Sequence, residues 1–288
     1  MIQGPSKTET QYRAIYLDSS SSLKDFSMDR RKYYKKYILN EVVEDEESKA
    51  ATMGRMVETL LMEPHLFEER FYISTCISTP TAMMLDFVEA LYKHTVEATA
   101  EDGTVTRSFE DLAKDAHADS GFKISLEAVL KKFIGSEAEI YYKEIREVRT
   151  KGLTVVTSAE ITNAEKVVIE LKTNSTTAEI VNLISDSQYS VYNQLQIEGY
   201  EVCDHQFKSM IDKMIVDHKA KTVQVYDLKC TWSVENFYNE YYLYRRAYIQ
   251  GYLYHQAAQF WASEMGYGDY KILYPKFIVC DSTNYANP

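Results

Sequence analysis

The fold is decided by two short stretches, residues 209–216 (SMIDKMIV) and residues 222–230 (TVQVYDLKC). Both are rich in β-branched and apolar residues, and a polar turn separates them, so we expect two neighbouring strands. Side chains alternate between the faces of a strand, which places Asp227 and Lys229 on the same side. The neighbouring strand can bring Asp212 close to them. Two carboxylates and one ammonium would then share one patch.

This set of side chains suits phosphate chemistry. Mg²⁺, for which Mn²⁺ is a possible substitute, binds carboxylate oxygens and completes its octahedron with waters and phosphate. The metal polarises the phosphate and lowers the pKa of a bound water. Lys229 can orient or help to deprotonate that water, or stabilise the charge that develops on the phosphate. The alternative is a surface ion pair on a hairpin, which is common in proteins.

The same three-residue pattern occurs a second time, in residues 169–173 (IELKT). There it lies in a helical stretch, because apolar residues recur at i, i+3, i+4 and i+7 from Ala164. Positions i and i+2 of a helix point in different directions, so Glu170 and Lys172 do not form a common patch. The short pattern is therefore weak by itself, and the hairpin context carries the prediction.

Four short blocks together resemble the PD-(D/E)XK nuclease superfamily. Asp212 followed by Asp227-Leu228-Lys229 is similar to its catalytic core, and residues 250–254 (QGYLY) match the Gln-x-x-x-Tyr motif of its RecB-like branch. Residues 54–61 (GRMVETLL) resemble that branch's helix motif, usually Gly-x-x-x-His followed by leucines. The order of the blocks is most similar to exonuclease VIII (RecE)-like phage recombination exonucleases.

The resemblance implies roles for particular residues. Asp212, Asp227 and Lys229 would be catalytic, and Asp212, Asp227 and Leu228 would bind the metal. Glu58 stands where the motif usually has histidine, and some phage exonucleases of this superfamily use a carboxylate there, so Glu58 is a further expected ligand. The other two catalytic positions follow from the Gln-x-x-x-Tyr motif. They are Gln250 and Tyr254, four residues apart on one helix face, which suits a clamp beside the metal.

The expected fold class is α/β, with a PD-(D/E)XK nuclease core, a central mixed sheet flanked by helices, and a helical insertion. We expect a single nuclease domain over residues 1–288. Its parts would be an N-terminal helical part at 1–75, which begins with an irregular segment at 1–17, a mostly helical insertion at 80–185 and a catalytic core at 190–288. Within that core, the pattern predicts a helix at 234–265 and a strand at 277–280.

The function implied is a metal-dependent DNA exonuclease that digests from duplex ends in phage-type recombination or DNA processing. A single-strand annealing protein and further copies of the chain would be its partners besides DNA. Two alternatives stay open. One is an endonuclease of the same fold, for repair, defence or packaging, and the other is a non-catalytic DNA-binding or assembly module.

Candidate DNA contacts lie mainly in one basic helix, which begins near Leu23 after a serine-rich stretch that can cap it. Arg246, one turn before Gln250, could contact a phosphate, whereas Arg245 more plausibly faces solvent. For Glu198 we favour a solvated strand carboxylate over a place in the site. The basic residues of the helix could track a DNA backbone or form a solvated face. They are Lys24, Arg30, Arg31, Lys35 and Lys36.

Tyrosine is abundant between residues 238 and 254. These rings could stack on bases, but we expect most of them to pack the helix on the sheet, with Tyr254 as the exception. The cysteines form no C-x-x-C pair and the histidines have no ligand spacing, so we expect neither zinc nor an iron–sulfur cluster. Free buried thiols are the simpler interpretation.

The net charge is −11, from 32 Lys and Arg against 43 Asp and Glu. This sign argues against a passive DNA-coating protein, because such a protein needs a positive surface. An enzyme can instead concentrate basic residues locally and use Mg²⁺ against phosphate repulsion. No apolar run approaches membrane-spanning length, and residues 1–7 lack a secretion signal. We therefore expect a protein of the cytoplasm of a bacterial host cell, without a membrane partner.

Overall fold

The computed structural model describes residues 7–41 and 48–282, and the chain divides into two compact units. One unit is Glu68–Ala159, and the other contains the chain on both sides of this segment. The helical insertion expected at 80–185 therefore begins and ends earlier. The helix α10 (Ser158–Thr173) belongs to the first unit, together with nearly all of the chain after it. Helical periodicity does not reveal which core a helix joins, so the sequence placed this boundary too late.

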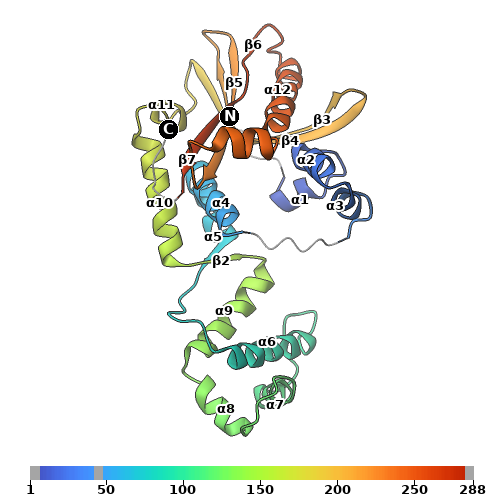
Figure 1. Cartoon of the computed structure of the whole chain (residues 1–288), viewed down its shortest axis with the longest axis vertical. Coiled ribbons are helices and arrows are strands. Elements are labelled where there is room, and N and C mark those ends of the chain that lie inside the picture. The colour runs from blue at the N-terminus through green and yellow to red at the C-terminus, as the bar shows by residue number, and fades with distance from the viewer. Residues whose placement is uncertain (1–6, 42–47, 283–288) are drawn as a thin grey trace. The chain divides into compact units, whose positions relative to one another are not determined.

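A five-stranded mixed sheet lies at the centre of the first unit (Figure 1). Its antiparallel strands are β3 (Tyr189–Val202), β4 (His205–Asp217) and β5 (Thr222–Thr231), and β6 (Lys271–Ile272) and β7 (Lys276–Asp281) run parallel to β5. The β-branched and aromatic residues of these segments favour such half-buried strands. The α/β class and the mixed sheet flanked by helices are confirmed, as is the strand expected at the end of the chain.

Two tight turns set the register of the antiparallel strands. Cys203 and Asp204, between β3 and β4, have φ values of 50° and 64°, the left-handed backbone that two-residue hairpin turns need. In the turn between β4 and β5, Asp217 Oδ1 accepts hydrogen bonds from the N–H groups of Lys219 and Ala220, each at 2.9 Å. A shift of one residue would turn every side chain to the opposite face, so these turns decide what faces the core.

The helix α12 (Ala247–Glu264) covers the sheet and buries one face in its core (Figure 1). Ala257 and Ala258 are fully buried there, and their small side chains let the helix approach the strands closely. Trp261 meets Tyr192 of β3 edge to face, with ring centroids 5.0 Å apart. This packing fixes the rotation of α12, and with it the direction in which each residue of the helix points.

The segment before the sheet is helical. Its elements within the first unit are α1 (Glu9–Arg13), α2 (Ser20–Met28), α3 (Arg30–Tyr33), a π-helix at Tyr34–Ile38, α4 (Lys49–Met62) and the short η2 (Pro64–Leu66). Ser19 caps α2 as expected, since its side chain accepts a hydrogen bond from the Ser22 N–H and the Ser22 side chain accepts one from the Ser19 N–H. The prediction of an irregular segment at 1–17 is wrong where α1 forms, and Thr8 and Gln11 make a capping box at the start of this helix. Residues 1–6 lie outside the described residues.

The second unit has its own elements and core. They are α5 (Phe67–Arg70, which begins at the boundary), β1 (Phe71–Ile73), α6 (Ala82–Glu97), α7 (Phe109–Asp119), α8 (Leu126–Phe133), α9 (Glu137–Lys151) and β2 (Thr154–Val156). The strands β1 and β2 pair in parallel. Phe87, Leu91 and Phe133 are among the buried residues of the core. The expected helical character of this region is confirmed.

Two expectations for the C-terminal part are wrong. The helix expected at 234–265 is interrupted, because a π-helix at Tyr238–Tyr244 ends before α12 begins, and Arg246 between them has a left-handed φ of 56°. The tyrosines of this region were expected to pack on the sheet, but Tyr244 is 70% exposed and Tyr252 is 55% exposed. Tyr254, which was expected to be the exception, is itself buried in the core between α12 and the sheet.

The cysteines are free, but they are not all buried as expected. Cys203 is exposed because it occupies the turn between β3 and β4, while Cys280 of β7 is buried. Cys280 pairs in register with Cys230 of β5, and their sulfur atoms lie 3.2 Å apart.

Among the helices of the described chain, none is both long and apolar enough to cross a bilayer.

Candidate active site

The candidate site lies where the strands β4 and β5 separate. The register pairs Lys213 with Tyr226, so the next residues, Asp212 and Asp227, face each other at the end of the paired segment. Beyond this point β5 continues beside β7, while β4 stays paired with β3 and forms one isolated bridge, between Phe207 and Asp18. The freed N–H of Leu228 donates a hydrogen bond of 2.7 Å to Asp212 Oδ2. A side chain thus replaces the strand partner that this N–H would otherwise need.

Asp227 and Lys229 form an ion pair on the same face of β5, as strand alternation predicts. Lys229 Nζ lies 2.5 Å from Asp227 Oδ2 and also donates a hydrogen bond of 3.3 Å to the carbonyl of Leu228. Asp227 is 1% exposed, and the side chain of Lys229 is 23% exposed. The ammonium therefore faces the carboxylate on one side and remains reachable by a substrate on the other.

The helix α12 holds the other oxygen of Asp227. Gln250 Nε2 donates a hydrogen bond of 2.7 Å to Asp227 Oδ1 and another of 2.8 Å to Tyr254 Oη. Tyr254 Oη in turn donates a hydrogen bond of 2.6 Å to the carbonyl of Met210 in β4. Because Gln250 and Tyr254 lie one turn apart on the buried face of α12, the helix fixes the orientation of the carboxylate.

Glu58 enters the site from α4, which packs against β4 and β5. Its Oε1 accepts a hydrogen bond of 2.6 Å from Nε2 of Gln194 in β3. Gln194 is 3% exposed and has a left-handed φ of 51° at an irregular point of the β3–β4 ladder. Such backbone costs about 1–3 kcal/mol in a residue other than glycine and concentrates at functional sites. Sequence analysis missed Gln194, because no local pattern marks it.

The electrostatics of the site are dominated by buried acids. Burial raises the pKa of Asp212 well above its usual range, and the charges of Asp227 and Glu58 act in the same direction. Burial likewise raises the pKa of Glu58, although Lys229 opposes this shift. Burial alone would lower the pKa of Lys229, but Asp227 and Asp212 raise it above its ordinary value. Burial therefore disfavours the charged forms of Asp212 and Glu58, whereas the neighbouring acids keep Lys229 protonated.

These side chains offer oxygen ligands of the kind that a hard cation prefers. Asp227 Oδ2 is buried and faces Lys229, yet no hydrogen bond of ordinary geometry reaches it from the described residues. Within residues 7–41 and 48–282, no group of three or more histidine, cysteine, aspartate or glutamate side chains is arranged to hold a metal ion. Mg²⁺ commonly takes only one or two carboxylates from a protein, and waters and phosphate complete its shell.

The basic residues expected to bind DNA lie outside this cluster. Arg30, Arg31 and Lys35 are exposed on α3 and the π-helix that follows it, and Lys35 faces Glu41 at 3.9 Å. Arg246 is half-buried at the start of α12, and its side chain has no hydrogen bond or ion pair with the rest of the described chain. The structure brings the acids and Lys229 together but not these cations.

Lys24 differs from the other basic residues of its helix. Its Nζ donates a hydrogen bond of 2.9 Å to Gln250 Oε1, which places it beside the catalytic candidates. The sequence places it in one basic segment with Arg30, Arg31, Lys35 and Lys36, and charge alone does not distinguish it from them. Glu198 is not in the site: it pairs with Lys7 at 2.6 Å. The second Glu-Leu-Lys pattern is on the helix α10, as predicted.

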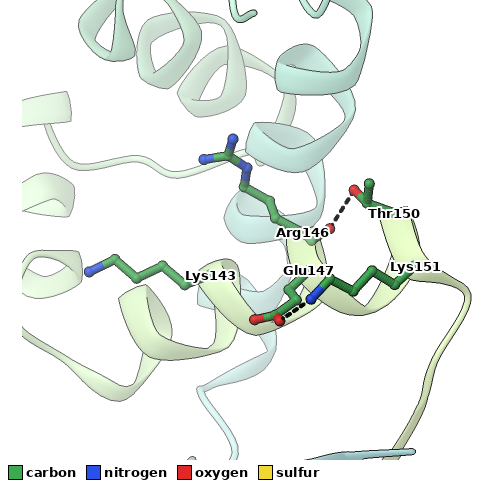
Figure 2. A pocket seen from close by; sticks show the side chains of 5 residues that line it. All are labelled: Lys143, Arg146, Glu147, Thr150 and Lys151. Atoms are coloured by element: carbon green, nitrogen blue, oxygen red, sulfur yellow. Dashed lines mark hydrogen bonds and ion pairs between the residues drawn. The ribbon is translucent and has the colours of Figure 1, made fainter. Parts of the chain in front are cut away.

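A shallow hollow elsewhere, in the second unit, is lined by residues of α9 (Figure 2). Two of its basic side chains are paired along the helix, Lys151 with Glu147 at 2.7 Å and Lys143 with Glu139 at 2.6 Å, and the Arg146 guanidinium lies over the Tyr142 ring, 5.6 Å from its centroid. Exposed pairs of this kind contribute little to stability and indicate a solvated helix face.

Comparisons of the chain with protein-family models, with curated proteins and with solved structures gave no significant match.

Proposed function

We propose that the chain is a metal-dependent deoxyribonuclease of the PD-(D/E)XK type, which hydrolyses phosphodiester bonds. The observation that carries this proposal is the position of Asp212, Asp227 and Lys229 at the point where β4 and β5 separate. A hairpin that needed only a stabilising ion pair would not also bury two acids with one lysine, because buried charge is costly without compensation.

Asp212 and Asp227 would hold Mg²⁺ or Mn²⁺, with Leu228 and Glu58 as further ligands. A bound divalent cation polarises a phosphate and lowers the pKa of a coordinated water. The fit rests on the buried acids, whose pKa values are raised because burial disfavours their charged forms. Leu228 can contribute only main-chain atoms, and its N–H is already bonded to Asp212, so its carbonyl would be the donor.

Lys229 acts as a charged donor in this proposal. Its pKa is raised, so it carries its proton at neutral pH and is poorly suited to act as a general base. A positioned ammonium instead stabilises the negative charge that grows on the phosphate during hydrolysis. Of the roles that the sequence left open for Lys229, the geometry favours this one.

Gln250 and Tyr254 are positioning residues in this proposal. Gln250 holds one oxygen of Asp227 and the other oxygen faces Lys229, while Tyr254 anchors Gln250 to the strand β4. Digestion from duplex ends, in phage-type recombination, is proposed from the order of the sequence motifs. An annealing protein and further copies of the chain are proposed as partners on the same ground.

The decisive experiment is digestion of linear and covalently closed duplex DNA with Mg²⁺. We expect the wild-type protein to degrade the linear form alone, because an exonuclease needs an end. Lys229→Ala and Asp227→Asn should lower the rate at least about 10²–10³-fold, as the loss of one charge-stabilising donor does. Lys172→Ala is the matched control, since it removes the lysine of the same short pattern from an exposed helix position.

Each outcome separates the alternatives. Degradation of both DNA forms would identify an endonuclease with the same site. No degradation of either form, by protein with a folded circular dichroism spectrum, would contradict the enzyme and leave a binding or assembly module. If Lys172→Ala loses as much activity as Lys229→Ala, the assignment of the active site to the hairpin of β4 and β5 would be contradicted.

A further inference from the structure

The catalytic candidates include a second lysine from outside the motif residues. Lys24 lies on α2, and α2 packs against α12 (Figure 1). Leu23, its neighbour, packs against the core of the sheet and α12, which anchors this part of the helix. The half-buried Lys24 side chain reaches Gln250, the residue that holds Asp227. The packing of α2 therefore holds Lys24 in this position.

The Lys24 ammonium has unused bonding capacity. An ammonium carries three N–H donors, and one of them is used by Gln250 Oε1. No carboxylate of the described residues forms an ion pair with Lys24. Burial lowers the pKa of Lys24 to about 8, and the nearby charge of Lys229 adds to this effect. A half-buried cation without a carboxylate partner is costly, and a bound anion would remove that cost.

A purely structural role does not explain a lysine at this position. A neutral glutamine could donate the same hydrogen bond to Gln250 without placing a charge in the interior. The nearby acids, Asp227 among them, attract the ammonium but do not contact it. What the position offers is a cation bonded to Gln250 and close enough to Asp227 and Lys229 to interact with their charges, with two of its three N–H donors not used by Gln250.

We propose that Lys24 is a second phosphate-binding cation of the catalytic centre, which contacts an oxygen of the phosphodiester held beside Asp227 and Lys229. This inference rests on the proposed nuclease function and names a further residue for it. The exposed cations Arg30, Arg31 and Lys35 can attract DNA through long-range charge. Lys24, in contrast, would fix the position of one phosphate relative to Asp227.

Binding of a fluorescent blunt-ended duplex, measured by anisotropy in EDTA between 50 and 200 mM salt, tests the proposal without cleavage. Lys24→Met and Lys24→Gln remove the charge, and Lys24→Gln keeps a donor for Gln250. Lys24→Arg keeps the charge, and Lys172→Met controls for a general loss of one charge. We expect both neutral variants to bind about tenfold or more weakly, as loss of a hydrogen bond to a charged group implies.

The salt dependence gives a readout that a structural role would not move. Loss of one phosphate contact should reduce the slope of log K against log salt by about 0.9. Lys24→Arg and Lys172→Met should keep the wild-type slope or nearly so. With Mg²⁺, the neutral variants should show a higher KM with a smaller change in kcat, because a contact made equally to substrate and transition state acts on binding.

The outcomes are distinguishable. Wild-type protein that binds neither duplex nor single-stranded DNA would contradict the proposed function and this inference together. Wild-type binding that all Lys24 variants retain would overturn the inference alone. If Lys24→Gln keeps the wild-type affinity for DNA and Lys24→Met loses it, Lys24 only holds Gln250 in place and does not bind phosphate, which would overturn the inference. If Lys24→Met does not fold, the comparison of Lys24→Arg with Lys24→Gln decides by itself.

Discussion

Individual acids of the site work against the stability of the fold. Asp212 is 8% exposed and receives one main-chain hydrogen bond, from Leu228. Asp227 and Glu58 lie close enough to raise its pKa further. Its folded-state pKa exceeds the unfolded value, so the folded protein binds more protons above about pH 4. The contribution of Asp212 to stability is therefore present at low pH and lost as the pH rises through the folded pKa.

Asp212→Asn should therefore stabilise the metal-free protein near neutral pH. Asparagine keeps an oxygen for the Leu228 N–H but has no charge to bury. We expect the free energy of unfolding at pH 8 to rise, because the side chain no longer has to carry a buried charge in the folded state. The fall in stability between pH 5 and 8 should become smaller. Urea unfolding in EDTA at several pH values measures both effects.

Asp217 is the control for this prediction. Its carboxylate lies in an exposed turn, and the hydrogen bond from the Ala220 N–H, with others, lowers its pKa. A group whose pKa is lower in the folded protein stabilises the fold at pH values above its unfolded-state pKa. This contribution is lost as the pH falls through the folded-state pKa. Asp217→Asn should thus lower stability at neutral pH, opposite in sign to Asp212→Asn. If both variants are destabilised at pH 8, Asp212 does not carry the buried charge described above.

The residues that sequence reasoning found and missed differ in a physical way. Asp227 and Lys229 follow from strand alternation, which depends only on neighbouring residues. Gln194 and Lys24 enter the site through packing and an irregular backbone, which involve segments far apart in the chain. A single sequence holds no local mark of such contacts. Lys24 was therefore grouped with exposed cations by its neighbours.

At the scale of the elements, the hairpin and the helix α12 were predictable, but the break before α12 was not. Alternation and the polar turn specify β4 and β5 in any context. The helical pattern at 234–265 continues through Arg246, whose left-handed φ of 56° ends it in the structure. Helix propensity is a weak term that tertiary packing overrides. Tyr238 and Tyr244, in the π-helix before the break, are 60% and 70% exposed, whereas Tyr242 still contacts Phe277 of β7.

The two faces of α12 provide a matched test of its role. Tyr254→Phe removes the hydroxyl that donates to the Met210 carbonyl and accepts from Gln250. We expect a loss of about 1–3 kcal/mol in unfolding free energy, because the buried groups lose their partner. The rate of DNA hydrolysis should fall as well, since Gln250 is then less well held.

Tyr252→Phe makes the same chemical change on the exposed face of the helix. Tyr252 is 55% exposed, so its hydroxyl can bond to water in either state. Stability within about 0.5 kcal/mol of the wild type is expected, as for other surface substitutions. Chemical unfolding and initial rates for both variants give the comparison. Equal effects in the two variants would contradict the clamp made by Gln250 and Tyr254.

Each of the two units has a hydrophobic core among its described residues. The first unit packs the sheet against α12, and the second packs α6, α7, α8 and α9 around Phe87 and Leu91. All the residues assigned to the candidate site belong to the first unit. The sequence predicted a helical insertion, but its single-domain description did not anticipate a second core, because composition does not show which apolar residues meet.

This division predicts that metal stabilises one unit and not the other. Mg²⁺ at 100 times its dissociation constant should stabilise the unit that binds it by about 2.7 kcal/mol. Calorimetry should show this shift in one of two transitions, since units with separate cores need not unfold together. Phe87→Ala, at a fully buried position, should lower the stability of the second unit by about 3–5 kcal/mol. Its metal-induced shift should be unchanged, whereas Asp227→Asn should abolish that shift. Loss of the metal response in Phe87→Ala would show that the site depends on the second core.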